Sequence, residues 1–467
     1  MLTMNTNPLR CRFVLAVVAT SVLLNSSSGQ TNFTILKSFK AVPDGNIPFC
    51  TLVVDTNGVL YGTTVGGGIS NQGSIFALNQ DGSGYVTLKS FAGTTNGVGP
   101  HAGLLLSTNG SLYGTTYGGG ISNFGTVFGV NRDGSGFAVL HSFTGSSDGK
   151  NLEAGLIEGS DGALYGLTYF SESATRGTIF KVNKDGGGYS ILHVFTGNPD
   201  GQQPQGRLLK ASDGALYGTT VFGSSLAGGT IFTLNEDGGG YHTIYNFRSI
   251  PGDGYGPVGG LIEGSDNVLY GTTYHGGGTG YDGTVFSVNK DGSNYQILHR
   301  FSTSGGDGQR ANGELMEGAD GALYGGTDSS ANLQGSIFKL NKDGGSYQLL
   351  RSFLSSGGDG HVPRCALLQV GSGALYGTTE FGGVGGAGCV FALSSTPLPP
   401  RILSLSVSSS SNVLQCAATS FVQYDIQRST NLSAWSTLTT LTSPTNGQIN
   451  YSDLAPLPAA YYRLQQH

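Results

Sequence analysis

The sequence predicts an all-β protein: a seven-bladed β-propeller closed by an N-terminal strand and followed by a small β-sandwich. Three observations predict this fold. One unit recurs seven times, each unit divides into four strand-like runs separated by tight turns, and the strand that the last unit lacks is found at the N-terminus. Short strands repeated at a period of roughly 50 residues are typical of propeller blades.

The composition favours strands and turns over helices. Of 467 residues, 80 are glycine and 11% are charged, whereas ordinary domains have roughly 7% glycine and about 25% charged residues. Each glycine costs a helix interior about 1 kcal/mol, which excludes a helical bundle. Glycine has no every-third-residue period, which excludes collagen, and the hydrophobic share of 37% is too high for a disordered chain.

Two short motifs mark the repeated unit. Leu-Tyr-Gly recurs every 52–54 residues, and threonine stands three places after its tyrosine each time. A second motif, Gly-Thr-Ile-Phe in the third unit, recurs with its phenylalanine in every unit. The tyrosines are Tyr61, Tyr113, Tyr165, Tyr217, Tyr270, Tyr324 and Tyr376, and the phenylalanines are Phe76, Phe128, Phe180, Phe232, Phe286, Phe338 and Phe391.

Four strands are expected in each unit. In the third unit they fall at 155–157, 163–169, 178–183 and 189–195. The dipeptides Asp161-Gly162 and Asp185-Gly186 separate the first strand from the second and the third from the fourth. Asp-Gly between apolar runs is a strong hairpin signal, because these residues tolerate the positive φ of tight turns.

The two ends of the repeat array predict a closed ring. Fourth strands end in phenylalanine in the first six units, but the seventh unit stops after its third strand at Leu393. The missing pattern stands near the N-terminus, from Phe33 to Phe39. A strand that completes the last blade would close the ring and remove the exposed sheet edges. An open β-solenoid is the alternative.

The N-terminus and the charge predict an exported chain. Arg10 and Arg12 precede an apolar run at 13–24 and small residues at 26–29, so we expect residues 1–29 to be a signal peptide and 31–393 to form the propeller. No later run is apolar enough for a membrane span. The net charge of −6 leaves no basic surface for nucleic acid. The mature chain is expected to be secreted, whether extracellular, periplasmic or associated with the cell surface.

Two cysteines occupy matching positions in the first and last units. Cys50 and Cys365 each stand eleven residues before the repeated tyrosine, where the other units have alanine or glycine. Ring closure would make these units neighbours, and an oxidising compartment would allow a Cys50–Cys365 disulfide. Two small buried thiols are the alternative.

The tail is expected to be a second domain. Residues 394–401 form a proline-rich linker, and 402–467 contain short strands typical of a small immunoglobulin-like or fibronectin type III-like β-sandwich. Trp435 and the pair Tyr461-Tyr462 are the expected core residues of this domain.

The repeats resemble the GloVer tandem-repeat family of exported bacterial proteins. The sequence motifs that carry the resemblance lie at 112–119 and 125–128, and equivalent motifs recur in all seven units. The resemblance implies an exported and often surface-attached repeat protein, but it brings no established activity and no catalytic residues.

The variable loops point to a binding face. In a propeller, the loops between the second and third strands share one face with the mouth of the central channel, and variable loops on a rigid scaffold commonly carry binding sites. Aromatic rings beside polar groups suit sugars. The expected ligand-binding residues are Phe49, His101, Glu153 and Arg364 at the channel mouth, with Tyr117, Tyr169, Tyr274 and Glu380 at the starts of neighbouring loops. The alternative is that these positions share no role.

Other charged positions have simpler interpretations. Glu158, Glu263 and Glu317, with Lys210 at the same place, are interpreted as a solvated ring of mixed charge at the opposite end of the first strands. His141, His193 and His299 share a place on the outermost strand, where polar groups would block edge pairing.

Function remains open among three classes. No catalytic motif, metal-binding spacing or cofactor motif occurs, so no cofactor and no metal are expected. These features favour a non-enzymatic protein that binds a polysaccharide or a cell-surface component. The first alternative is a hydrolase or lyase that uses acids and histidine at the channel mouth, such as Glu153 with His101 or Glu380 with Asp328. The second is a structural protein of the cell envelope or matrix.

Overall fold

The computed structural model describes residues 32–394 and 401–466, apart from 94, 172–175, 251, 278–281, 303–306, 330–333, 355–357, 372, 408–410, 418–422, 431–433, 443–447 and 455–459. All regular elements of these residues are strands, so the all-β prediction is confirmed. The predicted signal peptide and most of the predicted proline-rich linker lie outside the described residues. The chain divides into two compact units, with one boundary between Leu393 and Ser394.

The repeats form sheets of four or five antiparallel strands, seven such sheets among the described residues. The first two are β2 (Val53–Val54), β3 (Val59–Thr64), β4 (Ser74–Asn79) and β5 (Val86–Ser90), then β6 (Leu105–Leu106), β7 (Leu112–Thr116), β8 (Thr126–Val130) and β9 (Ala138–Ser142). The third is β10 (Ile157–Glu158), β11 (Leu164–Thr168), β12 (Thr178–Val182) and β13 (Ser190–Val194), close to the predicted strands. The fourth is β14 (Leu209–Lys210), β15 (Leu216–Thr220), β16 (Ala227–Leu234) and β17 (His242–Arg248).

The later sheets keep this order with small additions. The fifth is β19 (Ile262–Glu263), β20 (Leu269–Thr273), β22 (Thr284–Val288) and β23 (Gln296–Arg300). The sixth is β24 (Gln309–Ala311), β25 (Met316–Glu317), β26 (Leu323–Ser329), β27 (Ser336–Leu340) and β28 (Gln348–Ser352). Two short ribbons pair β18 (Gly254–Tyr255) with β21 (His275–Gly276) and β29 (Gly360–His361) with β32 (Phe381–Gly382).

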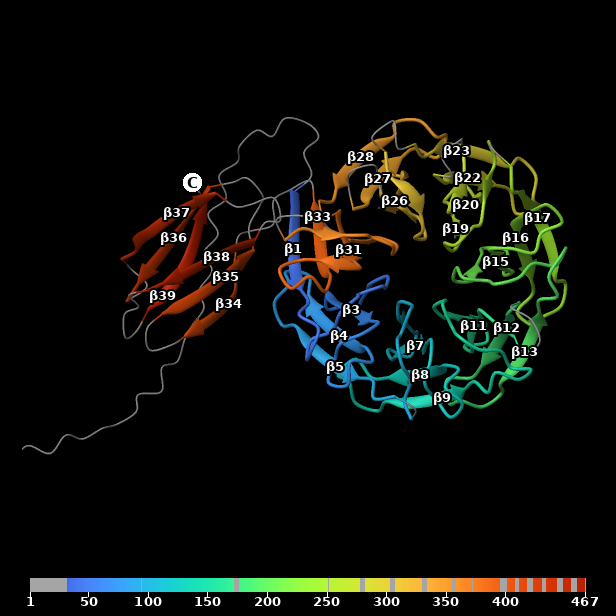
Figure 1. The fold of residues 1–467 in the computed structure, drawn as a ribbon, viewed down its shortest axis with the longest axis horizontal. Coiled ribbons are helices and arrows are strands. Elements are labelled where there is room, and N and C mark those ends of the chain that lie inside the picture. Colours follow the sequence, from blue (N-terminus) through green and yellow to red (C-terminus); the bar gives the residue numbers. More distant parts are fainter. Residues whose placement is uncertain are drawn as a thin grey trace, which may run out of the picture. The chain divides into compact units, whose positions relative to one another are not determined.

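The last sheet contains the first strand of the chain. Its order is β1 (Asn32–Ser38), β33 (Cys389–Ser394), β31 (Ala374–Thr379) and β30 (Leu368–Val370). Successive sheets follow one another around a common centre, and within a sheet the second strand lies nearer the centre than the fourth, as β7 and β9 illustrate (Figure 1).

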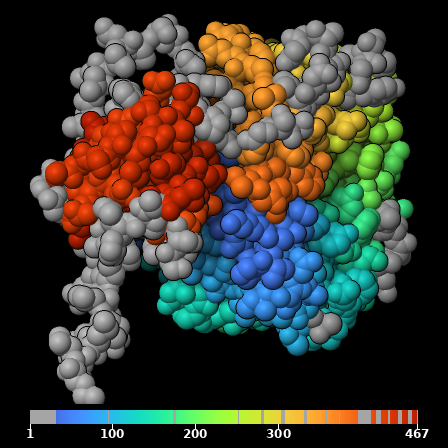
Figure 2. All heavy atoms as spheres, turned by 60° about the vertical axis from the view of Figure 1, so that its left-hand side comes forward, coloured from blue at the N-terminus to red at the C-terminus, as the bar shows by residue number. Residues whose placement is uncertain are grey.

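One backbone hydrogen bond links each repeat to the next. The residue fourteen places before each repeated tyrosine donates its N–H to a carbonyl in the preceding repeat. The pairs are Gly99 to Gln72, Asn151 to Phe124, Gln203 to Arg176, Gly256 to Gly228, Arg310 to Asp282 and Val362 to Gln334, at 2.6–3.0 Å. The equivalent residue of the first repeat, Ile47, donates to Ala387 O of the last repeat at 3.0 Å. Figure 2 shows the first repeat, in blue, against the last, in orange.

The hydrophobic core lies between neighbouring sheets. One cluster joins Tyr61, Ile75 and Phe91 of the first repeat to Leu112 and Phe128 of the second. The repeated phenylalanine explains the repeated glycine before it. A Cβ atom on Gly62 would lie 2.5 Å from Cζ of Phe76, so only glycine leaves room for the ring.

The repeated tyrosine is held by the turn before it. The phenol of Tyr270 donates a hydrogen bond to Asp266 Oδ2 at 2.7 Å, and Tyr324 does the same to Asp320 at 2.9 Å. In five repeats the aspartate of the tight turn therefore serves both the turn and the following strand, and in the second repeat Asn109 takes its place and donates to the Tyr113 hydroxyl.

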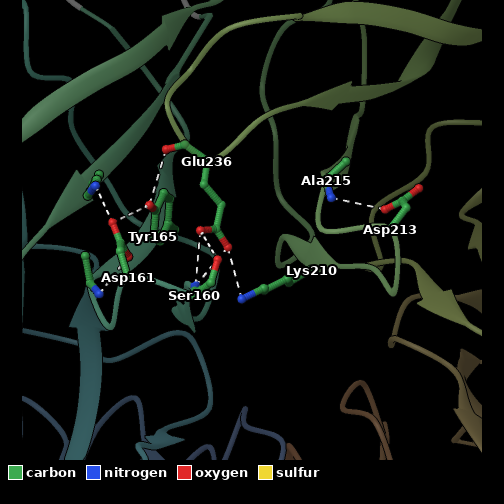
Figure 3. Close-up of polar contacts among 9 residues, drawn as sticks. Ser160, Asp161, Tyr165, Lys210, Asp213, Ala215 and Glu236 are labelled. Carbon is green, nitrogen blue, oxygen red and sulfur yellow. Dashed lines mark hydrogen bonds and ion pairs between the residues drawn. The ribbon is translucent and has the colours of Figure 1, made fainter.

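The charged ring at the far end of the first strands is not merely solvated, which corrects the prediction. Glu263 accepts hydrogen bonds from Ser212 of the preceding repeat and pairs with Lys290 of its own repeat at 2.5 Å. In the fourth repeat the two charges are exchanged: Lys210 stands in place of the glutamate, and Glu236 stands in place of the lysine. The Glu236 carboxylate pairs with Lys210 Nζ and accepts hydrogen bonds from Ser160 N and Oγ of the preceding repeat (Figure 3). The ring therefore joins neighbouring repeats.

The outer histidines also join repeats, so edge blocking does not describe their role. His193 stacks on Tyr241 of the next repeat, with ring centroids 3.6 Å apart, and its Nε2 lies 3.1 Å from Asp200 Oδ1. His141 and His299 stack on Tyr189 and Tyr347 in the same way.

The C-terminal unit contains two three-stranded sheets. One has the order β34 (Arg401–Val407), β35 (Asn412–Ala417) and β38 (Gln448–Asp453). The other has the order β37 (Ser436–Thr442), β36 (Gln423–Ser429) and β39 (Tyr461–Gln466).

The core of this unit differs from the prediction. Tyr462 is buried in it, together with Tyr424, Ile426 and Leu464, but Trp435 is not a core residue. Trp435 is half-buried, and the Arg463 guanidinium lies 4.4 Å from its ring centroid. Trp435 packs against the partly buried Arg463 cation, whereas the smaller Tyr424 fills the interior.

Candidate functional site

The site is a cavity of about 130 Å³ whose lining comes from all seven repeats. Each repeat contributes the residue twelve places before its tyrosine. These residues are Phe49, His101, Glu153, Gln205, Val258, Asn312 and Arg364. The four channel-mouth residues expected from the sequence therefore lie around one cavity.

A second ring of residues stands beside this cavity, at the start of each long loop. Its members are Val65, Tyr117, Tyr169, Val221, Tyr274, Asp328 and Glu380. In six of the repeats, the N–H of this residue donates to the carbonyl of the residue fourteen places before the tyrosine; Tyr169 N to Asn151 O, at 2.9 Å, is one example. These bonds attach the loop starts to the channel wall.

The backbone at the channel wall is left-handed in every repeat. The residues fourteen places before the tyrosine have φ between 55° and 66°, and they include the β-branched Ile47 and Val362. A β-branched residue in this region is strained and is held by its surroundings. Here the two hydrogen bonds of that residue, to the preceding repeat and to its own loop, hold it.

Aromatic rings dominate one side of the site. His101 stacks on Tyr117 with centroids 4.6 Å apart, and Phe49 meets His101 edge-on at 6.4 Å. The Nδ1 atom of His101 lies 3.3 Å from Glu153 Oε2. The Tyr169 phenol interacts electrostatically with the Glu153 carboxylate. This aromatic side comes from the first three repeats.

Charged groups dominate the other side, which we call the ionic trio: Asp328, Arg364 and Glu380. Arg364 Nη2 lies 3.5 Å from Asp328 Oδ2, and Arg364 Nε lies 3.3 Å from Glu380 Oε2. Tyr274 interacts with Asp328, and the Arg310 guanidinium lies 5.6 Å from the Tyr274 ring centroid. The two sides meet where Arg364 lies 5.9 Å from the ring centroid of Phe49.

The two carboxyl groups of the trio resist ionisation. Burial raises the pKa of Asp328, and the nearby Arg364 and Arg310 charges counter this only in part. Burial also raises the pKa of Glu380, and the Asp328 carboxylate adds to that rise. Burial raises the pKa of Tyr117, Tyr169 and Tyr274 as well, so these phenols keep their protons at neutral pH.

A further ion pair joins two residues that line the cavity. Arg207 Nη2 lies 2.8 Å from Glu314 Oε1, and both residues line the cavity from repeats that are not neighbours. Sequence reasoning missed this pair. The available signal was that the other repeats have only threonine, glycine or alanine at this position.

The two cysteines lie close to each other but are not bonded. Cys50 is buried, accepts a hydrogen bond from Thr63 N at 3.2 Å, and influences the titration of Cys365. Burial raises the pKa of Cys50 to about 11. Both are free thiols in this structure, so the disulfide stays a prediction.

The sequence also missed Arg310, while it treated Asp328 only as a neighbour of Glu380. Arg310 lies in the strained backbone position, where the other repeats have short or uncharged side chains.

Within the described residues, no group of three His, Cys, Asp or Glu side chains is arranged to hold a metal ion. No helix among those residues is both long and apolar enough to span a bilayer.

The repeats match the model of one known protein family. The Gloeobacter/Verrucomicrobia repeat matches residues 20–211 and 203–397, which together cover most of the chain. The chain belongs to the Gloeobacter/Verrucomicrobia repeat family. The predicted resemblance is therefore confirmed for the repeats. No curated protein matches the chain.

Several solved structures are distantly similar. The extracellular domain of BT3049 from B. thetaiotaomicron, assigned to a hybrid two-component system, is 11% identical with a TM-score of 0.49, over 94% of this chain and 58% of the other. TolB from Acinetobacter baumannii is 14% identical with a TM-score of 0.36, over 74% and 78%. A chain of the nidogen/laminin complex is 15% identical with a TM-score of 0.38, over 55% and 82%. At these scores none of them supports an inference about what this chain binds.

Proposed function

We propose that this protein is an exported, non-enzymatic seven-bladed β-propeller that binds a polysaccharide at the mouth of its central channel. The observation that carries the proposal is that four sequence-predicted residues, Phe49, His101, Glu153 and Arg364, line one cavity. Tyr117 stacks on His101 and Glu380 pairs with Arg364, so that aromatic rings lie on one side and charged groups on the other. Sugar rings offer apolar C–H faces and hydroxyl groups together, and they match this division.

Ring closure is part of the proposal. The bond from Ile47 N to Ala387 O has the form of the six bonds that join consecutive repeats, which supports the first and last repeats being neighbouring blades. The sheet that contains both β1 and β33 supports a blade completed by the N-terminal strand. A closed ring would hold the seven channel-mouth residues at constant separations.

Export and the C-terminal domain complete the proposal. Residues 1–29 would direct the chain out of the cytoplasm. The six C-terminal strands, in two sheets of three, are compatible with a shortened fibronectin type III-like sandwich that serves as a spacer or a second contact module.

The test is binding of the mature chain to a polysaccharide array, followed by calorimetry on the strongest ligand. Replacing Tyr117 and Tyr274 together by alanine is expected to weaken binding at least tenfold, since each ring would lose its sugar contact. Val86→Ala is the control, because Val86 is 47% exposed on β5, the fourth strand of its sheet, away from the variable loops. If no polysaccharide binds, or if the double variant binds as well as the parent, the proposal fails.

A hydrolase or lyase is the second candidate. The observation that favours it is the pair Asp328 and Glu380, two buried carboxyl groups with raised pKa values on one guanidinium. A carboxyl group that keeps its proton can act as a general acid. Release of new reducing ends or unsaturated ends from a bound polysaccharide, abolished by Glu380→Gln and by Glu153→Gln, would support this candidate.

A further inference from the structure

Arg207 and Glu314 meet in the cavity from two repeats that are not neighbours. Each stands two places beyond the channel-mouth residue of its repeat, where the other repeats have only threonine, glycine or alanine. A Cβ atom on Gly155 would lie 3.6 Å from Arg207 Cδ, and one on Gly260 would lie 3.4 Å from Glu314 Cδ. The two long side chains therefore lie over glycines of the third and fifth repeats, which leave them room.

The Arg207 guanidinium is held on one side and open on the other. Its Nη2 donates to Glu314 Oε1 at 2.8 Å, and it has no other hydrogen bond to the described residues. The side chain lines the cavity and is 44% exposed, and its other nitrogen atoms are accessible there. With one of the five N–H donors of a guanidinium used, four are open to a ligand.

Two amides continue these open donors toward the channel mouth. Gln205 and Asn312 are the channel-mouth residues of the same two repeats, and both are half-buried in the cavity lining. Among the described residues, neither of these side chains forms a hydrogen bond. Arg207, Gln205 and Asn312 therefore present accessible donors to one cavity, and we call these three residues the open wall.

The other cationic residues of the cavity lining are engaged differently. Arg364 lies within 3.5 Å of two carboxyl groups, those of the ionic trio. His101 lies 3.3 Å from Glu153 and stacks on Tyr117. Arg207 has a single carboxylate on one edge, so its other edge can take a second anionic group.

The chemistry of the open wall favours an acidic group. Carboxylate and sulfate oxygens accept hydrogen bonds without donating any, and a guanidinium binds them through two parallel charge-assisted bonds. A neutral hydroxyl group gains neither the second parallel bond nor the charge. The Glu314 carboxylate fixes the orientation of the guanidinium and raises the pKa of Arg207, which keeps it charged.

We propose that Arg207, held by Glu314, binds a carboxylate or sulfate group of an acidic polysaccharide, with Gln205 and Asn312 as further donors. This inference rests on the proposed function and names its substrate class. Carboxylate and sulfate share the chemistry of an anionic oxygen group, and the first experiment separates them.

The first experiment uses the unaltered mature chain and two matched pairs of polymers. Polygalacturonate is compared with the same polymer after its carboxyl groups are reduced to primary alcohols, and dextran sulfate is compared with dextran. At least one acidic polymer is expected to bind about tenfold or more tightly than its neutral counterpart. General attraction would not explain this preference, because the chain has a net charge of −6.

The outcomes separate the two proposals. Preference for polygalacturonate identifies the carboxylate, and preference for dextran sulfate identifies the sulfate. Equal or tighter binding of the neutral counterparts would overturn the inference while leaving polysaccharide binding intact. Absence of binding to these four polymers and to the wider array would contradict the proposed function, and the inference with it.

The second experiment removes both charges of the pair, so that no unpaired charge is left in the cavity. Arg207→Gln with Glu314→Gln is expected to weaken binding of the acidic polymer about tenfold or more and to leave the affinity for its neutral counterpart unchanged. Glu317→Gln with Lys342→Gln is the matched control, because this pair at 2.7 Å also loses one charge of each sign but lies in the charged ring.

Circular dichroism establishes that each variant is folded. Arg207→Lys keeps the positive charge and replaces the planar fork by one ammonium group, so it is expected to weaken acidic binding as well. It provides the test if the double variant does not fold. Unchanged affinity for the acidic polymer in the folded variants would overturn the inference.

Discussion

Thr378 donates its hydroxyl to the carbonyl oxygen of Cys50 at 3.0 Å, although 328 positions separate them in the chain. The equivalent threonines Thr63 and Thr115 donate to Ala102 and Ala154 of the next repeat in the same way. The contact between the last and first repeats is thus chemically the same as the contact between consecutive repeats.

The N-terminal strand segment is expected to be essential for stability. Phe39 is fully buried, and its ring packs edge-on against Phe76 of the first repeat with centroids 5.3 Å apart. Phe39→Ala should lower the free energy of unfolding by about 3–5 kcal/mol, as for other large buried side chains. Urea unfolding of the mature chain measures this. A loss no greater than that of Val86→Ala would show that the segment is dispensable.

Swapping the charges of Lys210 and Glu236 in the fourth repeat should preserve stability only when both are swapped together. Lys210→Glu alone brings two glutamates together at Ser160 and is expected to cost about 1 kcal/mol of stability, as is Glu236→Lys alone. The double variant restores the arrangement of the third, fifth and sixth repeats, so it should recover most of the loss. A double-mutant cycle on thermal unfolding measures the coupling, and additive losses would contradict it.

Acid should weaken the charged ring. Burial alone would raise the pKa of Glu158, but hydrogen bonds from Lys184, Ser107 and Thr108 lower it to about 2. A carboxyl group whose folded-state pKa is depressed contributes stability above its unfolded pKa and loses it as the pH falls toward the folded pKa. The window is therefore about pH 4.5 to about 2, with at most about 3 kcal/mol at stake. Glu158→Gln should flatten the stability profile in this window, and an unchanged profile would contradict the assignment.

The ionic trio should trade stability for binding. Because the pKa values of Asp328 and Glu380 are raised in the folded protein, their ionisation opposes folding, and stability should fall as the pH rises through these values. Asp328→Asn should therefore raise the stability of the ligand-free protein more at pH 7 than at pH 4, while it weakens ligand binding. Thermal unfolding at pH 4 and pH 7 tests this. A variant that is less stable at both pH values would show that the carboxylate is structural.

The cysteine pair gives a redox prediction. If the protein is exported to an oxidising compartment, we expect a Cys50–Cys365 disulfide, formed with the loss of two hydrogens to a thiol oxidant such as another disulfide. Non-reducing peptide mapping by mass spectrometry measures it. Both peptides recovered as free thiols would establish the alternative of two small buried thiols, which burial keeps protonated.

The sequence by itself determined the repeats, their strands and the turns, because these depend on local interactions. Asp161-Gly162 forms the predicted tight turn between β10 and β11, and Phe180 accepts only glycine at position 166 because its ring fills the space of a Cβ atom. The positions around the channel mouth could also be predicted, since they recur at one place in every repeat.

Only the tertiary structure decided which of these residues interact. The ion pairs Arg364–Asp328 and Arg207–Glu314 and the hydrogen bonds from Ser160 to Glu236 each join two different repeats. Their separation depends on how far each repeat is rotated from the last, a quantity that no single repeat encodes. Tertiary packing also decided the position of Trp435. Its hydrophobicity predicts a core residue, but the ring lies against Arg463 and outside the buried cluster of the C-terminal unit.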